Sequence, residues 1–396
     1  MHVFSSLFKT SHISIRYKVE SIAGNILCWV KKPDYKSIRK KLIKSKCIDD
    51  NTGFTIISKD IFISKSDNTI MIIFQDFKQI FNVDKIFSLK ELKLNRQNLD
   101  HLELLGQLTN LSFVYLYPNQ RTKISSEIGN LTNLTKLYLN QNKLTKIPSE
   151  IGNLINLTDL SLHFNRLTII PSEIGNLTNL IGLYLSDNKL TNLPSEIGKL
   201  TSLDILYLSN NRLTDLPSEI RKLANLTQLH LNNNQLTNLP REIWNLTSLI
   251  NLDLCSNKLT NVPSKIGKLT KITYLDLSGN ELTSISSEIG KLANLINLSL
   301  RSNKLTNLPS EIGNLANLTY LDLTFNKLTN VPSGIGNLIN LTDLYLGNNK
   351  LTTLPSEIGK LTNIRELYLN NNKLTNKFKV QINSWFKNGV CLNFGY

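Results

Sequence analysis

The chain of 396 residues contains 41% hydrophobic and 7% aromatic residues, the composition of an ordinary soluble protein, and its formal net charge of +15 favours acidic partners in general. No run of about 18 apolar residues occurs, so no segment is expected to span a bilayer. The four cysteines, Cys28, Cys47, Cys255 and Cys391, have neither a C-x-x-C pair nor the spacing of a disulfide framework, which argues against a structural zinc site and a disulfide-stapled fold.

Residues 1–86 come first in the chain and are expected to form a small basic N-terminal region that contains β-strands. Residues 1–18 lack the apolar core and small-residue cleavage site of a secretory leader, so we expect an intracellular, cytoplasmic location. The runs 54–58, 60–64 and 69–74 alternate between apolar and polar residues, as short strands do. Because the open end of a stacked repeat array needs a cap, we interpret residues 1–86 as that cap.

A basic segment within this region has two interpretations, and the sequence leaves both open. Residues 31–46 carry Lys31, Lys32, Lys36, Arg39, Lys40, Lys41, Lys44 and Lys46. A solvated helix face explains these charges without any function, whereas contact with nucleic acid or another anion would give the segment a role. Tyr35 is the segment's one aromatic residue on which a base of a single strand could stack, so nucleic acid is the less favoured ligand.

An asparagine recurs every 23 residues through the rest of the chain and defines a repeat. The twelve asparagines are Asn119, Asn142, Asn165, Asn188, Asn211, Asn234, Asn257, Asn280, Asn303, Asn326, Asn349 and Asn372. Before each lies a leucine-rich segment such as 134–139 (Leu-x-x-Leu-x-Leu), and after most lies a segment such as 144–154, with Ile-Pro-Ser-Glu-Ile-Gly at its centre. An earlier unit around Leu92 has Gln97 at the asparagine position. These units predict about 13 repeats over residues 87–376.

The two halves of the repeat predict different local structures. Alternating leucines, such as Leu137 and Leu139, favour a short strand with one apolar face, and stacked strands of this kind bury that face in a parallel sheet. The asparagine is expected to bond the backbone of its own turn and of the next coil. In the second half, Pro148 suits the first position of a short helical turn, Glu150 its N-terminal end, and Gly152 its stop. We therefore predict an α/β solenoid with a curved parallel β-sheet on its concave face and short helical turns on its convex face.

These motifs resemble the leucine-rich-repeat family and are similar to its 23-residue intracellular subclass, which Ras-suppressor-type and scribble-type scaffold proteins share. The resemblance covers about residues 87–376 and implies a leucine-rich-repeat solenoid that binds proteins without a cofactor. It suggests a small GTPase, or a signalling or ubiquitin-pathway component, as the class of partner. The chain departs from the pattern at Arg121 (for leucine), Ser125 and Ser286 (for proline), Lys265 and Gly334 (for glutamate), and Arg221 and Trp244 (for glycine). Because glycine is absent at Arg221 and Trp244, these two turns are not expected to have the tight stop that glycine gives.

The residues between the core leucines are expected to face outward on the concave side, because side chains alternate along a strand. The candidate partner-binding residues on this face are Tyr115, Tyr138, Tyr184, Tyr207, His230, Asp253, Tyr274, Asp276, Arg301, Tyr320, Asp322, Tyr345 and Tyr368. The tyrosines offer a large contact area at low entropic cost. Asp253 and Asp276 fall on adjacent strands, where two exposed carboxylates repel each other and attract a cationic group of a partner, with Arg301 as partial compensation. A simpler interpretation makes all of these residues solvent-facing positions without a partner.

The sequence argues against an enzyme and against a cofactor or metal site. His163 and His230 fall three strand steps apart, roughly 14 Å, which is too far to share a metal ion. Asp253 and Asp276 lie on an open face where no pocket is expected to shift a pKa, and Cys255 has no His or Lys beside it to form a thiolate. We therefore predict a non-catalytic protein-interaction scaffold or adaptor in signalling. The alternative is a nucleic-acid- or anion-binding protein that acts through the basic segment.

Residues 377–396 are expected to cap the C-terminal end of the repeats. They contain an apolar set, Phe378, Ile382, Trp385 and Phe386. As a lid, these side chains would cover the leucines of the last repeat. The alternative is that they form a docking peptide for a partner.

Overall fold

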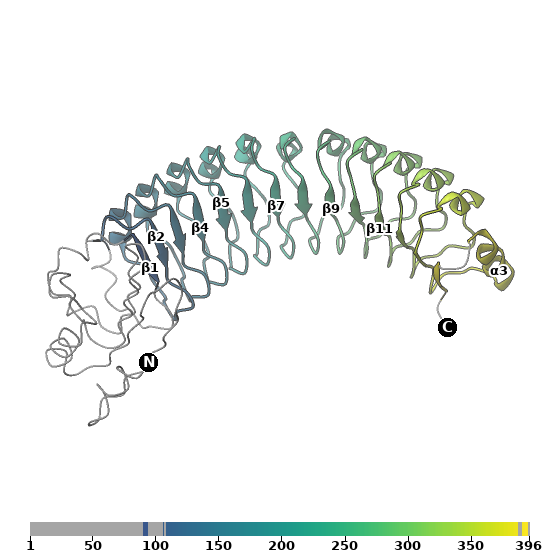
Figure 1. Cartoon of the computed structure of the whole chain (residues 1–396), viewed down its shortest axis with the longest axis horizontal. Helices are drawn as coiled ribbons and strands as arrows, with labels where there is room; N and C mark the ends of the chain where they lie inside the picture. The colour runs from purple at the N-terminus through teal and green to yellow at the C-terminus, as the bar shows by residue number, and fades with distance from the viewer. Residues whose placement is uncertain (1–89, 94–105, 107, 387–389, 395–396) are drawn as a thin grey trace, which may run out of the picture. The chain divides into compact units, whose positions relative to one another are not determined.

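The computed structural model describes residues 90–93, 106, 108–386 and 390–394. The predicted N-terminal cap and its basic segment lie outside the described residues. The chain divides into a first unit, Met1–Tyr184, and a second unit, Leu185–Tyr396, each with its own series of repeats (Figure 1).

Strands of three residues alternate with 3₁₀ turns of five residues in both units. The first unit contains the strands β1 (Glu91–Lys93), β2 (Phe113–Tyr115), β3 (Lys136–Tyr138), β4 (Asp159–Ser161) and β5 (Gly182–Tyr184), and the turns η5 (Ser126–Asn130), η6 (Ser149–Asn153) and η7 (Ser172–Asn176). The second unit contains the strands β6 (Ile205–Tyr207), β7 (Gln228–His230), β8 (Asn251–Asp253), β9 (Tyr274–Asp276), β10 (Asn297–Ser299), β11 (Tyr320–Asp322), β12 (Asp343–Tyr345), β13 (Glu366–Tyr368) and β14 (Cys391–Asn393). Its turns are η8 (Ser195–Lys199), η9 (Ser218–Lys222), η10 (Arg241–Asn245), η11 (Ser264–Lys268), η12 (Ser287–Lys291), η13 (Ser310–Asn314), η14 (Ser333–Asn337) and η15 (Ser356–Lys360), and the helix α3 (Asn376–Trp385) follows β13.

Every strand within a unit pairs in parallel with the next, one repeat further along the chain. Val114 lies beside Leu137 in the first unit, and Leu229 lies beside Leu252 in the second. The turns of each unit run along the outer side of its curve (Figure 1). The predicted solenoid of parallel strands and short helical turns is confirmed.

The leucines of the strands form the core of each unit, as their alternation predicts. Leu137 and Leu139 in the first unit, and Leu252 and Leu254 in the second, are completely buried. In β3 and β8 the strand residues on either side of the central leucine are partly exposed. Each buried leucine stabilises the fold by about 1.5–3 kcal/mol relative to an exposed one. Since one coil alone leaves this face open, the stability comes from stacking the coils.

The repeat asparagines crosslink neighbouring coils through their amides, as Asn234 illustrates. The Nδ2 of Asn234 donates to the carbonyl of Leu231 in its own coil (2.9 Å) and to that of Leu208 in the preceding coil (3.0 Å). Its Oδ1 accepts from the N–H of Leu213, also in the preceding coil (3.0 Å). The bonds within the turn are confirmed, but the second partner is the preceding coil and not the next one. The repeat period alone does not determine the direction in which the amide reaches.

Two further features of the turn went unpredicted. From Gln141 onward the residue before the repeat asparagine has a positive φ, such as 54° at Asn233 and 54° at Phe164, so these coils turn through a left-handed residue. A second asparagine, in the Asn-Leu-Thr segment, also joins coils: Asn225 Nδ2 donates to the carbonyl of Thr201 at 2.9 Å. Its recurrence at the repeat period was the signal in the sequence.

Proline and glycine play roles in the 3₁₀ turns that differ from the prediction. Pro148 precedes η6 in an extended conformation (φ −68°, ψ 150°), and its carbonyl accepts from the N–H of Ile151 at 3.1 Å. Gly152 lies inside the turn with a negative φ, so it is not a left-handed stop. A Cβ at Gly152 would lie 2.6 Å from the carbonyl oxygen of Glu173, so glycine is needed because the next turn passes this close.

The two turns that lack this glycine keep their five residues. η9 has Arg221 and η10 has Trp244 at the position, and the Trp244 side chain is only 1% exposed. The expected loss of a tight stop in these turns is therefore wrong, because the glycine controls the approach of neighbouring turns and not the end of its own.

The C-terminal residues form one helix and one further strand. The hydroxyl of Thr375 accepts from the N–H of Phe378 and caps α3. Ile382 is completely buried, while Val380 on the same helix is 68% exposed. After α3, strand β14 pairs in parallel with β13 and places Leu392 beside Leu367, which the sequence pattern did not predict.

Candidate functional site

Nearly all predicted contact residues lie on the outward positions of the sheet. Twelve of the thirteen are partly or fully exposed: Tyr115, Tyr138, Tyr184, Tyr207, His230, Asp253, Tyr274, Asp276, Arg301, Tyr320, Tyr345 and Tyr368. Asp322 is the exception, with 5% exposure. The sequence therefore located the outward face correctly and misjudged one of its residues.

The sheet of the first unit presents an aromatic surface with balanced charge. The rings of Tyr115 and Tyr138 stack with their centroids 4.8 Å apart. Lys136 Nζ and Asp159 Oδ2 lie 3.4 Å apart on neighbouring strands and neutralise each other. Burial raises the pKa of Tyr138, so its hydroxyl is neutral at physiological pH.

The sheet of the second unit carries two groups of neighbouring rings, one stacked and one tilted. Tyr207 stacks on His230 with centroids 4.3 Å apart, and its hydroxyl donates to Gln228 at 2.7 Å. Tyr345 lies between Tyr320 and Tyr368, at 5.4 Å and 5.0 Å. Ring stacking across strands restricts the rotamers of these side chains, so they are presented in a preorganised arrangement.

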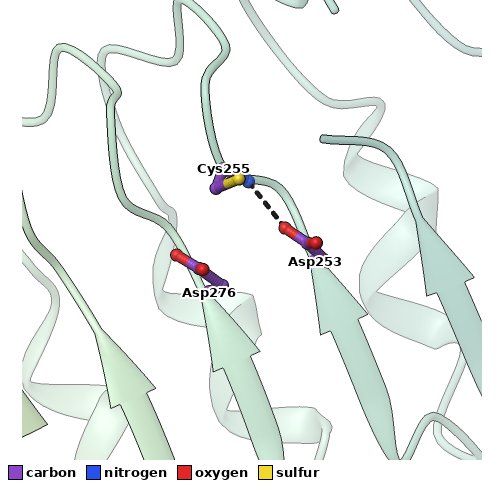
Figure 2. Close-up of side chains that lie close together, drawn as sticks. All are labelled: Asp253, Cys255 and Asp276. Atoms are coloured by element: carbon purple, nitrogen blue, oxygen red, sulfur yellow. Dashed lines mark hydrogen bonds between the residues drawn. The ribbon is translucent and has the colours of Figure 1, made fainter. Parts of the chain in front are cut away.

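Between these two groups lies a cluster of Asp253, Cys255 and Asp276 (Figure 2). Asp253 and Asp276 are register neighbours on β8 and β9. The Oδ1 of Asp253 accepts from the N–H of Cys255 at 3.0 Å, and the Oδ1 of Asp276 accepts from the N–H of Ser278 at 2.8 Å. One side-chain oxygen or sulfur atom from each of the three residues lies within 4.8 Å of the others.

The cluster is more shielded from water than the sequence suggested. Burial raises the pKa of Asp253, and the Asp276 carboxylate raises it further, against the opposing hydrogen bond from Cys255. Burial, helped by the two carboxylates, raises the pKa of the Cys255 thiol to about 12. The expectation that nothing shifts a pKa on this face is therefore wrong, whereas the expectation that Cys255 is not a thiolate is confirmed.

Tyr274 and His230 flank the cluster: Tyr274 lies on the same strand as Asp276, and His230 is the register neighbour of Asp253. Burial and the Asp276 carboxylate raise the pKa of Tyr274, whose hydroxyl lies 3.4 Å from Asp276 Oδ2. Burial lowers the pKa of His230, although the Asp253 carboxylate opposes this effect. Both flanking side chains are therefore neutral at pH 7 and do not offset the negative charge.

Asp322 is a buried, hydrogen-bonded carboxylate and not a surface one. Its Oδ1 accepts from the N–H and the hydroxyl of Thr324, at 2.8 Å and 2.7 Å. Arg301 Nη1 lies 4.0 Å from its Oδ2, and the Arg301 guanidinium also lies 5.0 Å from the centre of the Phe325 ring. The compensation predicted for Arg301 thus acts on Asp322, and no described Lys or Arg forms an ion pair with Asp253 or Asp276.

Two carboxylates and a thiol are groups that can ligate a metal ion. The sequence did not lead us to predict that Cys255 lies beside the two aspartates. The signal was available, because Cys255 is two residues after Asp253 and one repeat separates the aspartates. A thiol with a raised pKa must lose its proton before it binds a metal, which weakens such a site at neutral pH.

The stacked parallel strands, the repeat asparagines and the outer turns define a leucine-rich-repeat protein. The sequence model of the family described as a leucine-rich repeat region matches residues 61–186, 182–262 and 250–386, and the chain belongs to this family. No curated protein matches the sequence.

Solved structures of other leucine-rich-repeat proteins are similar to this chain. A leucine-rich-repeat protein of Leptospira interrogans is 38% identical, with a TM-score of 0.68 over 82% of this chain and 89% of that one. A plant peptide hormone receptor, solved in complex with its peptide, is 31% identical, with a TM-score of 0.60 over 73% of this chain and 53% of the receptor. Toll in its complex with Spatzle from Drosophila is 26% identical, with a TM-score of 0.67 over 82% of this chain and 47% of that one. Among the described residues of this chain, no helix has the length and hydrophobicity to cross a membrane.

Proposed function

We propose that this chain is a non-catalytic binding protein that holds a protein partner on the outward faces of its sheets. The observation that carries the proposal is the preorganised row of tyrosines. Tyr115 stacks on Tyr138 in the first unit, and Tyr345 packs between two tyrosines in the second. Aromatic side chains held in place lose little entropy on binding and supply much of the energy of protein interfaces.

The similar structures support a protein as the partner. The plant receptor was solved with a peptide hormone, and Toll was solved with the protein Spatzle. The finer predictions from the sequence are part of this proposal: a role as an intracellular scaffold or adaptor, and a partner that is a small GTPase or a signalling or ubiquitin-pathway component. The sheet residues proposed to make contact are the twelve exposed candidates named above.

Affinity capture with the full chain tests the proposal. A sheet variant carries Tyr138→Ala and Tyr345→Ala. A control variant carries Ile155→Ala and Ile339→Ala, which removes two apolar side chains that are 53% and 58% exposed away from the strands. We expect mass spectrometry to identify proteins that the wild type and the control retain and the sheet variant loses. Equal retention by the sheet variant would contradict binding through the sheet.

A further inference from the structure

The outward face of the second unit is acidic, although the chain as a whole is basic. The chain has 45 Lys and Arg residues and 30 Asp and Glu residues. Strands β6 to β13 carry no Lys or Arg, but they carry Asp253, Asp276, Asp322, Asp343 and Glu366. This face therefore has the opposite charge to the one that the overall composition would give it.

Most basic residues of the second unit lie away from these strands, whereas Arg301 follows β10 by two residues and Arg365 directly precedes β13. Lys258, Lys304, Lys327 and Lys350 directly follow the repeat asparagines and are exposed. Lys304 pairs with Glu281, which is also off the sheet, at 2.9 Å. Among the residues that the structure describes, Lys and Arg form no ion pair with the carboxylates on strands β6 to β13 other than the Arg301–Asp322 pair.

Within the described part of the chain, four carboxylates of this face thus have no ion-pair partner: Asp253, Asp276, Asp343 and Glu366. Asp343 accepts a hydrogen bond from the hydroxyl of Thr342 at 2.6 Å, and Glu366 accepts one from the hydroxyl of Tyr345. These neutral donors orient the carboxylates and leave their charge in place. Like charges on register neighbours such as Asp253 and Asp276 destabilise a sheet, so folding alone does not explain this arrangement.

Tyrosines stand beside the same carboxylates. Tyr274 lies next to Asp276, and Tyr320 is the register neighbour of Asp343. The hydroxyl of Tyr345 donates to Glu366. A ring face attracts an ammonium or guanidinium group that a neighbouring carboxylate holds. Carboxylates beside aromatic rings are the surroundings that a lysine or arginine side chain of a partner requires.

We propose that the sheet face of the second unit binds a segment of its protein partner that is rich in lysine and arginine, with Asp253 and Asp276 receiving one basic side chain. This inference rests on the proposed function and adds the chemistry of the partner. A second basic residue meets Asp343 and Glu366. From the centre of the β8–β9 pair to the centre of the β12–β13 pair there are four strand spacings, roughly 19 Å, which an extended segment covers in about six residues. The partner segment therefore carries two basic positions about six residues apart.

Fluorescence anisotropy with labelled peptides and the full chain tests this inference. The basic probe has two Arg-Lys pairs separated by serines at this spacing, and probes of equal length carry glutamate or asparagine instead. We expect the basic probe to bind more tightly than both others, and its affinity to fall as salt screens the charges. An equal affinity for the basic and the asparagine probe would overturn the proposal.

Two matched charge variants locate the binding. Asp253→Asn with Asp276→Asn is expected to weaken the basic probe about tenfold or more, as loss of charge-assisted hydrogen bonds does. Asp215→Asn with Glu311→Gln changes the net charge equally off the sheet and is expected to change the affinity by about twofold at most. An equal loss in both variants would mean a general charge effect and would overturn the proposal. Circular dichroism melting checks that both variants are folded.

Two further outcomes keep this inference separate from the proposed function. One outcome is that the Asp253→Asn, Asp276→Asn variant still captures the partner that the tyrosine variant loses. That result would support a protein partner on the sheet and would refute a lysine- and arginine-rich segment of that partner as the bound part. The peptide titrations are repeated with EDTA and with added Zn²⁺. Binding of the basic probe in EDTA is expected, and binding that Zn²⁺ alone enables would show that the cluster is a metal site and overturn the proposal.

Discussion

Asp253 illustrates, at the scale of single residues, how this protein differs from one selected for stability alone. Its carboxylate lies beside that of Asp276 in a partly buried position, and no cation accompanies it among the described residues. Desolvation and like charge both oppose its ionised form. Surfaces on which desolvation and like charge destabilise the free protein are commonly binding surfaces, because a partner supplies the missing interactions.

Replacement of Asp253 by asparagine is expected to stabilise the folded chain at neutral pH. Folding raises the pKa of Asp253 above its ordinary value of 3.8, so the folded state holds this proton more tightly than the unfolded state does. Stability from this group is therefore present at low pH and is lost as the pH rises through the folded-state pKa. Asp253→Asn removes this loss of folding stability at neutral pH. The asparagine keeps a side-chain oxygen that accepts the hydrogen bond from the Cys255 N–H.

Thermal melting at several pH values measures this effect. The variant should melt at a higher temperature than the wild type at pH 7, and the difference should vanish near pH 3. Asp215→Asn, on the exposed surface, is the control and should leave the melting temperature unchanged. A lower melting temperature for Asp253→Asn at pH 7 would show that burial and Asp276 do not destabilise the carboxylate.

The Cys255 thiol provides a second prediction at this scale. Because its pKa is raised to about 12, the reactive thiolate is scarce at pH 8, and iodoacetamide should modify it slowly. Asp253→Asn with Asp276→Asn removes two negative neighbours and should speed the modification. Peptide mapping by mass spectrometry follows Cys255, with the exposed Cys391 as an internal reference. Modification of Cys255 as fast as that of Cys391 in the wild type would contradict the raised pKa.

At the scale of elements, the spacing between neighbouring 3₁₀ turns decides which residues a turn accepts. A Cβ at Gly152 would lie 2.6 Å from the backbone of the next turn, and at Gly313 it would lie 2.1 Å from the carbonyl oxygen of Gly334. The closer approach occurs where glycine replaces the usual glutamate. The turns therefore stack backbone to backbone, and the glycine is a packing residue.

Gly152→Ala is expected to destabilise the array by about 1–3 kcal/mol, the usual effect of overpacking. Gly359→Ala is the matched control, because its Cβ would meet Trp385 Cβ at 3.3 Å and no backbone atom closer. Urea unfolding followed by circular dichroism compares the two variants. Equal urea midpoints for the two variants would mean that neighbouring turns can move apart without loss of stability. The close approach of the turns would then not explain the glycine at position 152.

At the scale of the whole molecule, an array of this kind depends on its ends, because each repeat is stabilised mainly by its neighbours. The helix α3 lies against η15, with Trp385 beside Gly359. Ile382 is the completely buried residue of this helix. We propose that residues 377–396 cap the second unit, as the apolar set in the sequence predicts.

Ile382→Asp is expected to open this end of the second unit, because a buried carboxylate without a partner is costly. The loss should be about 2–5 kcal/mol. Hydrogen exchange should lose protection over residues 340–393 first, while the strands around β8 stay protected. Val380→Asp places the same charge at a 68% exposed position of the same helix and should change neither property. Equal exchange in both variants would contradict a capping role.

The sequence alone was sufficient for the fold and for the outward face. Leucines at a fixed period determine which side chains are buried, since an apolar face must be covered wherever the chain stacks on itself. The same alternation placed Tyr138 and Tyr345 outside and Leu137 inside. These predictions depend only on periodicity, which a sequence displays directly.

Only the tertiary structure decided the remaining properties, because they depend on distances and desolvation between coils. It showed that Asp322 is buried and hydrogen-bonded, and that Cys255 joins the two aspartates. It also showed that Gly152 is needed by the adjacent turn and not by its own. A repeat pattern states which residues recur, whereas the depth of a carboxylate and the gap between two backbones follow from how the coils stack.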